Sequence, residues 1–200
     1  MALIKLSNNG VKNISSVGSI GTGELKFISK QTASSSASIS FTSGIDSTYK
    51  EYIFYFVNIH PATDNVQFQF NGSTDGGSNY NATKTTTHFR AYHDEADANT
   101  NLGYSTSWDL AQSTSDQYLT HGIGNDNDQD ANGYLHIFNP SSTTFVKHFI
   151  SRTNTHQKDN WTIDGYTAGY FNTTSSVDAV RFQMSSGNID SGDILLYGVN

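Results

Sequence analysis

A stretch in the second half of the chain has the residue types of a calcium-binding loop. Oxygen-bearing side chains stand at alternating positions, Asp128, Asp130 and Asn132, and Gly133 follows them. This order matches the first six positions of a calcium loop, in which carboxylate and amide oxygens bind the ion and glycine permits a sharp turn. The twelfth position is Asn139 instead of a bidentate glutamate. The pattern therefore predicts either a calcium site at these three side chains or an Asp- and Asn-rich turn before a strand.

A second acidic group, Asp94, Glu95 and Asp97, follows His93 in the first half of the chain. Glycoside hydrolysis needs two carboxyl groups at a set separation, and this group supplies the residue types. The sequence does not give the separation, and an exposed loop accounts for the same residues. We expect a protein that is not an enzyme, and a glycan hydrolase using Asp94, Glu95 or Asp97 is the alternative.

Seven histidines are spread along the chain, and none forms a pair at the close spacing of a helical zinc site. His136 and His148 fall on neighbouring expected strands. We expect these two to form a cross-strand pair on the surface of a sheet.

Four large aromatic residues offer a different chemistry. Trp108, Trp161, Tyr80 and Tyr104 all lie in or beside loop-like, Asn-rich segments. Aromatic rings that face solvent form platforms on which sugars stack, so these four are candidate glycan-binding residues. The alternative is that they cap the hydrophobic core at the edges of the sheets.

The composition excludes several partners and cofactors. The formal charge of −7 argues against nucleic acid, because nucleic-acid binders normally carry a basic patch. The chain has no cysteine, so disulfides and thiolate metal sites are excluded, and no cofactor other than calcium is expected. No run approaches the roughly 18 apolar residues of a membrane helix, so we expect no membrane insertion. We also read no export signal at the amino terminus.

Hydrophobic alternation predicts an all-β domain. Apolar residues alternate with polar ones between clusters of Gly, Asn, Asp and Ser along most of the chain, and no comparable helical run appears. Eight to eleven strands are expected, which suits a two-sheet antiparallel β-sandwich with a jelly-roll order. Residues 52–59 are apolar on both faces, so this run is either a central internal strand or a place where subunits meet.

The first 24 residues are predicted to form an extended amino-terminal docking arm, and residues 25–200 the β-sandwich domain. The arm is rich in Gly, Ser and Asn and cannot form a core alone. Its scattered apolar side chains would bind a partner or the chain's own domain. The candidate partner-binding residues are Leu3, Ile4, Leu6, Val11 and Ile14.

Several stretches carry a resemblance to a known class of protein. They are residues 1–6, 39–45, 138–144, 168–174, 184–189 and the closing 192–198. Together they resemble small virion structural proteins of tailed bacteriophages, particularly those of marine cyanobacteria. The resemblance spans nearly the whole chain and carries over no catalytic residue. It implies attachment through a short amino-terminal segment and display of a β-sandwich on the head or tail, often as an oligomer.

We therefore expect a non-enzymatic virion protein, either a capsid decoration or a tail-fibre component, assembled in the host cytoplasm. Its expected partners are other virion proteins of the capsid or tail and further copies of itself, with a trimer as the first guess. The alternative is an adhesin that binds a glycan of the host surface. The two functions are compatible with each other.

Overall fold

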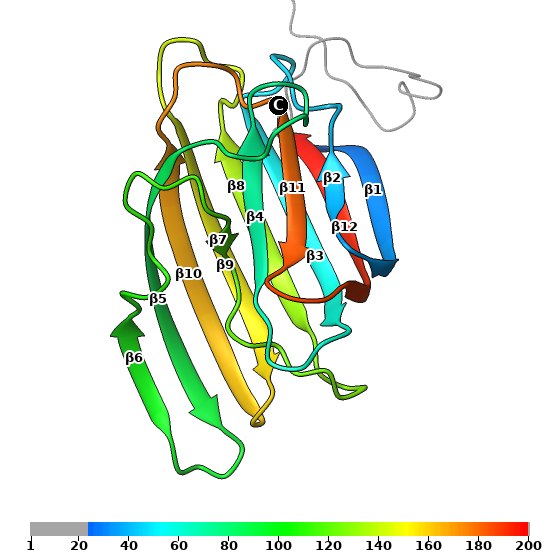
Figure 1. Ribbon diagram of the computed structural model, residues 1–200, viewed down its shortest axis with the longest axis vertical. Coiled ribbons are helices and arrows are strands. Elements are labelled where there is room, and N and C mark those ends of the chain that lie inside the picture. The colour runs from blue at the N-terminus through cyan, green and yellow to red at the C-terminus, as the bar shows by residue number, and fades with distance from the viewer. Residues whose placement is uncertain (1–23, 200) are drawn as a thin grey trace, which may run out of the picture.

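The computed structural model describes residues 24–199, and all regular secondary structure in them is β-strand (Figure 1). This part of the chain contains no helix that could cross a membrane. Its strands are β1 (Leu25–Ser36), β2 (Ile39–Phe41), β3 (Glu51–Pro61), β4 (Phe68–Ser73), β5 (Lys84–Asp94), β6 (Thr100–Tyr104), β7 (Gln117–Tyr118), β8 (Ala131–Phe138), β9 (Lys147–Gln157), β10 (Trp161–Phe171), β11 (Ala179–Met184) and β12 (Ile189–Val199).

These strands form two antiparallel sheets that pack face to face, so the expected all-β sandwich is confirmed. The large sheet has eight strands in the order β1-β12-β3-β8-β9-β10-β5-β6. The small sheet has four, in the order β2-β11-β4-β7. Figure 1 shows the small sheet in front of one half of the large sheet, while β5 and β6 extend beyond it on the left.

The jelly-roll order stays a prediction, and the strand order supports it. The chain passes between the sheets so that the strand orders contain β1-β12-β3-β8 and β2-β11-β4-β7, which is the kind of order that two interlocked Greek keys produce. Two hairpins, β5–β6 and β9–β10, add four strands to one edge of the large sheet. They create a wide sheet whose inner face is only partly covered by the small one.

The core lies between the sheets and is dominated by phenylalanine. Phe182 of β11 is fully buried and lies 5.2 Å from the ring of Phe54, 5.3 Å from Phe56 and 5.6 Å from Phe68. Phe54 and Phe56 come from β3, which lies between β12 and β8 in the middle of the large sheet. β3 is therefore a central strand of the large sheet, as expected. Val57 on its other face is exposed, so the alternative that subunits meet at residues 52–59 stays a prediction.

The closing pattern, residues 192–198, has a structural explanation. Ile194 and Leu196 of β12 point into the core, and the side chains between them point outward. Gly192 has a φ of +120°, and a Cβ there would lie 2.5 Å from the Asn58 carbonyl oxygen. The pattern thus builds a central strand and supplies no reactive group.

Two sequence expectations need correction or fall outside the described part. The number of strands in residues 24–199 is twelve, above the predicted eight to eleven. The strand that was missed is β6, a short edge strand with exposed side chains, because it is held mainly by backbone pairing with β5 and shows no alternation. The candidate arm residues Leu3, Ile4, Leu6, Val11 and Ile14 lie outside the described residues.

Candidate functional site

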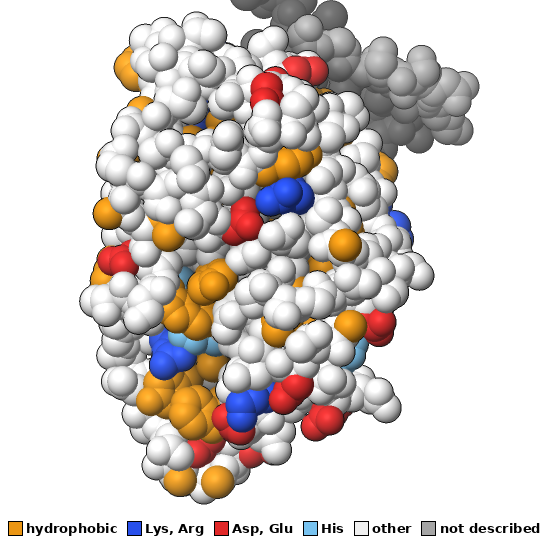
Figure 2. Space-filling model, in the orientation of Figure 1, with side chains coloured by type: hydrophobic (Ala, Val, Ile, Leu, Met, Phe, Trp, Pro, Cys, Tyr) orange, Lys and Arg blue, Asp and Glu red, His pale blue; other side chains and the backbone are white. Residues whose placement is uncertain are grey.

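The candidate site lies on the inner face of the added strands. Residues 117–123 cross this face next to the small sheet: Thr153 donates a hydrogen bond of 2.6 Å to the Leu119 carbonyl, and Thr86 donates one of 2.6 Å to Gln117 Oε1. Past this segment, the inner face of β5 and β10 is left without a covering strand. Figure 2 shows hydrophobic side chains gathered there beside basic and histidine side chains.

Five side chains form a continuous strip along this face, which we name the aromatic strip: Trp108, His121, Arg90, Tyr92 and Trp161. The Trp108 and His121 rings stack with centroids 3.7 Å apart. The Arg90 guanidinium contacts His121 and lies 5.1 Å from the Tyr92 ring centroid. Tyr92 in turn stacks on Trp161 at 4.7 Å. The two tryptophans of the chain thus lie at the two ends of one strip.

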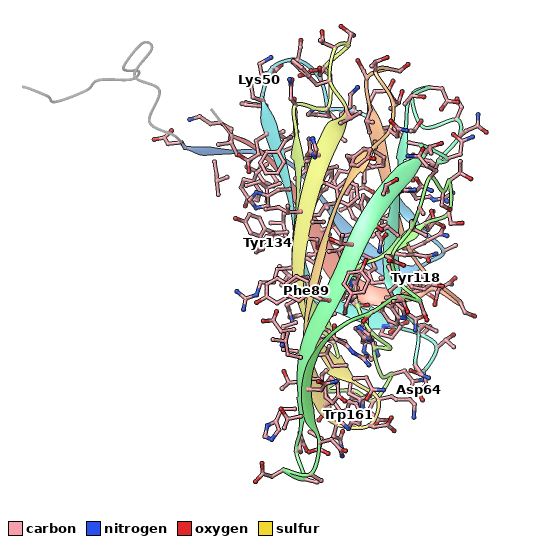
Figure 3. All side chains as sticks on the ribbon, turned by 90° about the vertical axis from the view of Figure 1, so that its left-hand side faces the viewer. Lys50, Asp64, Phe89, Tyr118, Tyr134 and Trp161 are labelled. Carbon is pink, nitrogen blue, oxygen red and sulfur yellow. The ribbon has the colours of Figure 1, made fainter. Side chains whose placement is uncertain are left out.

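Strand periodicity places the middle of the strip. Side chains alternate between the faces of a strand, so His88, Arg90 and Tyr92 of β5 all point inward. Trp161 begins β10 directly opposite Asp94 of β5. Figure 3 shows Trp161 near the lower end of the sheet.

Trp108 is held by a buried glutamine. Gln117 Nε2 donates a hydrogen bond of 2.9 Å to the Trp108 carbonyl, while its Oε1 accepts from Thr86. Because both ends of this buried amide are used, the loop carrying Trp108 is fixed to β5. The strip is therefore organised before any ligand arrives, which lowers the entropy cost of binding.

A series of hydrogen bonds fixes His121 of the strip and its neighbour His88. Arg90 can only donate, so Nδ1 of His121 accepts its hydrogen bond and the neutral His121 ring carries its proton on Nε2. Nε2 of His121 lies 3.3 Å from Nε2 of His88, and Nδ1 of His88 lies 2.8 Å from Thr167 Oγ1. When both rings are neutral, Nε2 of His121 donates to Nε2 of His88, and Nδ1 of His88 donates to Thr167, so every contact in this series joins a donor to an acceptor.

The pKa values of both histidines agree with this assignment. Burial lowers the pKa of His88 to about 4, with a further contribution from the charge of Arg90. Burial, then Arg90, then His88 lower the pKa of His121 to about 2. Both rings are therefore neutral at pH 7, and Arg90 supplies the positive charge of the strip.

A hollow of about 410 Å³ adjoins the outer end of the strip. Trp161 lines it together with Glu95, Asn154, His156 and Asn160. Nε2 of His156 is buried and has no hydrogen-bond partner among the described residues. A volume in this range suits a small ligand. The polar side chains of Asn154 and His156 point to the outer side of β9, away from the inner face that carries the strip.

This arrangement can bind a sugar. Ring faces at both ends of the strip offer apolar platforms, while Arg90 offers hydrogen-bond donors to hydroxyl groups.

Comparisons with known proteins leave the interpretation to this geometry. No protein-family model, no curated protein and no solved structure matches the chain. The site is therefore interpreted from its residues and their geometry.

Of the four aromatic residues that the sequence singled out, the structure brings together two. Trp108 and Trp161 belong to the aromatic strip. Tyr80 packs against the guanidinium of Arg181 on the small sheet, 4.7 Å from its ring centroid. Tyr104 points to the opposite, outer face of the large sheet and donates a hydrogen bond of 2.6 Å to Asp109. A single four-residue ligand site is therefore not formed.

The acidic group of residues 94–97 mainly holds the β5–β6 turn. Asp94 accepts hydrogen bonds from the backbone N–H groups of Ala98 and Asn99, at 2.8 and 3.0 Å. Hydrogen bonds from Asn99 hold the pKa of Asp94 below its ordinary value, whereas a general acid needs a raised pKa. Asp97 is exposed and lies 3.0 Å from His93. Asp94 and Glu95 both line the hollow beside Trp161.

The calcium site stays a prediction. Asn132 Oδ1 accepts a hydrogen bond of 2.8 Å from the Asn58 backbone N–H, and its amide group donates to Asp130 at 3.0 Å. These contacts engage two of the three candidate ligands, and Asp128 is exposed. Within the described part of the chain, no group of three or more His, Cys, Asp or Glu side chains is placed to hold a metal ion.

The expected histidine pair is not formed. His136 lies opposite Ile150 in the register of β8 and β9, and it is hydrogen-bonded to Glu51. His148 lies opposite Tyr170 of β10. The prediction failed because the turn between β8 and β9 sets a register that the two strand sequences alone do not reveal.

Three strip residues, Arg90, His121 and Tyr92, were not identified from the sequence. The alternation in residues 88–92 was the available signal, since it places His88, Arg90 and Tyr92 on one face. No sequence signal brings His121 onto that face, because it belongs to the crossing segment 117–123.

Proposed function

We propose that this chain is a non-enzymatic structural protein of a tailed-phage particle, a capsid decoration or tail-fibre component that displays its β-sandwich on the particle. The chain is assembled into the virion in the host cytoplasm and binds other virion proteins and copies of itself. The observation that carries the proposal is that aromatic rings are presented on both faces of the wide sheet, while Asp94 and Asp97 are engaged in the β5–β6 turn. These surfaces suit binding better than catalysis.

The attachment mechanism is the burial of the arm's apolar side chains against a virion partner. Each such side chain would contribute roughly 1.5–3 kcal/mol when fully buried, so several together would hold the arm on its partner. Replacing Leu3, Ile4, Leu6, Val11 and Ile14 by serine in the full chain should abolish incorporation into particles produced in infected cells. The variant should stay soluble and unfold at the same temperature as the unaltered chain, and normal incorporation would contradict the mechanism.

A second candidate function, glycan binding to a host surface, is favoured by the aromatic strip. Trp108 and Trp161 are far apart in the sequence, and both present partly exposed rings on one preorganised surface. Part of a bacterial surface polysaccharide would stack on these rings, with Arg90 contacting its hydroxyl groups. On this proposal, the particle protein is also a receptor-binding adhesin.

A glycan array of bacterial surface polysaccharides tests the second function. Trp161→Ala and Trp108→Ala should each weaken binding by about 2 kcal/mol or more, which is roughly thirtyfold in Kd. Tyr80→Ala is the matched control, because this ring lies away from the strip against Arg181 and should leave binding unchanged. Binding that survives both tryptophan changes would rule out the strip as the glycan site.

A further inference from the structure

The outer face of the large sheet, which points away from the small sheet, carries most of the exposed apolar surface. Eight large hydrophobic side chains of the described residues are strongly exposed, and the register of the strands places seven of them on this face. These seven are Leu25, Phe27, Val57, Phe89, Leu102, Tyr104 and Ile150. The eighth, Phe145, lies in the loop before β9. Apolar surface gathered on one face marks an interaction site.

One row of paired residues crosses all eight strands on this face, and we name it the outer row. In sheet order from β1 to β6 it consists of Lys30, Leu195, Tyr55, Tyr134, Arg152, Tyr166, Phe89 and Tyr104. Phe89 and Tyr166 stack with centroids 4.6 Å apart. Figure 3 shows Phe89 and Tyr134 on the same side of the sheet, opposite to Tyr118.

The charges in and beside the outer row are neutralised within the face. Arg152 donates to Asp164 at 2.7 Å and Lys30 donates to Asp193 at 3.0 Å. The whole chain has a formal charge of −7, so most of its surface would repel a second copy. Because the charges on this face are paired, two copies can bring it together without electrostatic repulsion.

The outer row is complementary to its own reverse. Consider a second copy rotated by 180° about an axis that runs along the strands between β8 and β9, so that its outer row lies over that of the first copy in reverse order. Each cation of one copy then lies opposite a tyrosine of the other, and each remaining side chain of the row lies opposite a ring or an apolar side chain. The opposed pairs are Lys30 with Tyr104, Leu195 with Phe89, Tyr55 with Tyr166, and Tyr134 with Arg152. Cation–π contacts of this kind are attractive, because the positive charge lies over the negative face of the ring.

The neighbouring row is complementary in shape. It places the large, half-buried Tyr197 on the β1 half of the face and the small Thr87 and Ala168 on the β6 half. The same rotation sets Tyr197 of one copy against Thr87 of the other. The surface around Thr87 and Ala168 is hollowed by about 220 Å³, which gives the incoming side chains room.

We propose that a second copy of this chain docks on the outer face, related by a two-fold axis that runs along the strands between β8 and β9. The contact is isologous, so both copies use the same surface. Six central strands at about 4.8 Å spacing and about 36 Å in length give a footprint of roughly 1,000 Å². That exceeds the about 800 Å² that each partner buries in a standard stable interface. The inference deepens the self-association in the proposed function and replaces the expected trimer by a face-to-face pair.

Sedimentation equilibrium of the full chain tests this contact. The unaltered chain should have twice the mass of one copy. Ile150→Asp places a carboxylate beside the axis and should raise the dissociation constant at least tenfold, and Thr87→Trp should do the same by filling the hollow without adding charge. Phe145→Asp is the matched control, since it changes an even more exposed apolar residue outside the face and should leave the mass unchanged.

Cross-linking gives a second measurement that does not depend on weakening the contact. The chain has no cysteine, so Ile150→Cys provides one thiol per copy close to the axis. A bis-maleimide that spans about 10 Å, the distance between stacked sheets, should join two copies of this variant and not two copies of Phe145→Cys.

Either of two results would overturn the inference: a monomeric unaltered chain, or a trimer or other oligomer whose mass is unaffected by Ile150→Asp and Thr87→Trp. Both results leave the proposed virion role intact. That role fails instead if the chain is missing from particles, whatever its mass in solution.

Discussion

Replacing Phe182 by alanine lowers the free energy of unfolding by about 3–5 kcal/mol. Phe182 is fully buried and its ring contacts those of Phe54, Phe56 and Phe68, so its loss leaves a cavity bounded by both sheets. For a domain of this size the change lowers the melting temperature by roughly 10–15 °C. Thermal and urea unfolding followed by circular dichroism measure it.

The control for this change is Phe145→Ala, because Phe145 is exposed in a loop. It should change the free energy of unfolding by less than about 0.5 kcal/mol. A loss below about 1 kcal/mol for Phe182→Ala would mean that the two sheets are not joined through this aromatic core.

Acidification from pH 7 to pH 4 destabilises the fold through its buried histidines. The pKa of His88 is lowered to about 4 in the folded chain, against about 6.5 when unfolded, so the unfolded chain binds the proton first. The free energy of unfolding is therefore at its full value above about pH 6.5 and falls as the pH drops towards 4. His88 alone accounts for about 3 kcal/mol of this loss, and His121 acts in the same direction.

Urea unfolding at a series of pH values checks the sign and the origin of this effect. His88→Gln should remove the His88 share and so reduce the loss of stability between pH 6.5 and 4, whereas His148→Gln, at an exposed position, should leave it unchanged. Carboxylates such as Asp75, whose pKa is lowered to about 2 by hydrogen bonds from Asn79 and Ser73, act below this window. A flat profile in the unaltered chain would contradict the neutral, hydrogen-bonded histidine pair.

The two-sheet architecture could be predicted because apolar and polar residues alternate along most of the strands. The run at residues 52–59 identified β3, and burial of Phe54 and Phe56 follows from strand periodicity. The edge strand β6 could not be found in this way, since its side chains are exposed and its pairing with β5 is a backbone property. The register of β8 with β9 was equally out of reach, so the His136 and His148 prediction was wrong.

The site was only half predictable for a related reason. Trp108 and Trp161 were recognisable as large aromatic residues in polar surroundings, but their common position depends on the loop held by Gln117 and on the pairing of β10 with β5. Tyr80 and Tyr104 have the same local signature and lie on other surfaces. Residue type therefore indicated the chemistry, and only the fold decided which residues share a surface.

The protein content of purified phage particles tests the central claim most directly. Particles of the phage that encodes this chain under the proposed function would be banded on a density gradient, washed in high salt and analysed by quantitative mass spectrometry. The proposed function predicts that the chain is present at a fixed number of copies per particle. Its absence from washed particles, with the chain recovered only in the lysate of infected cells, would contradict the role of virion structural protein.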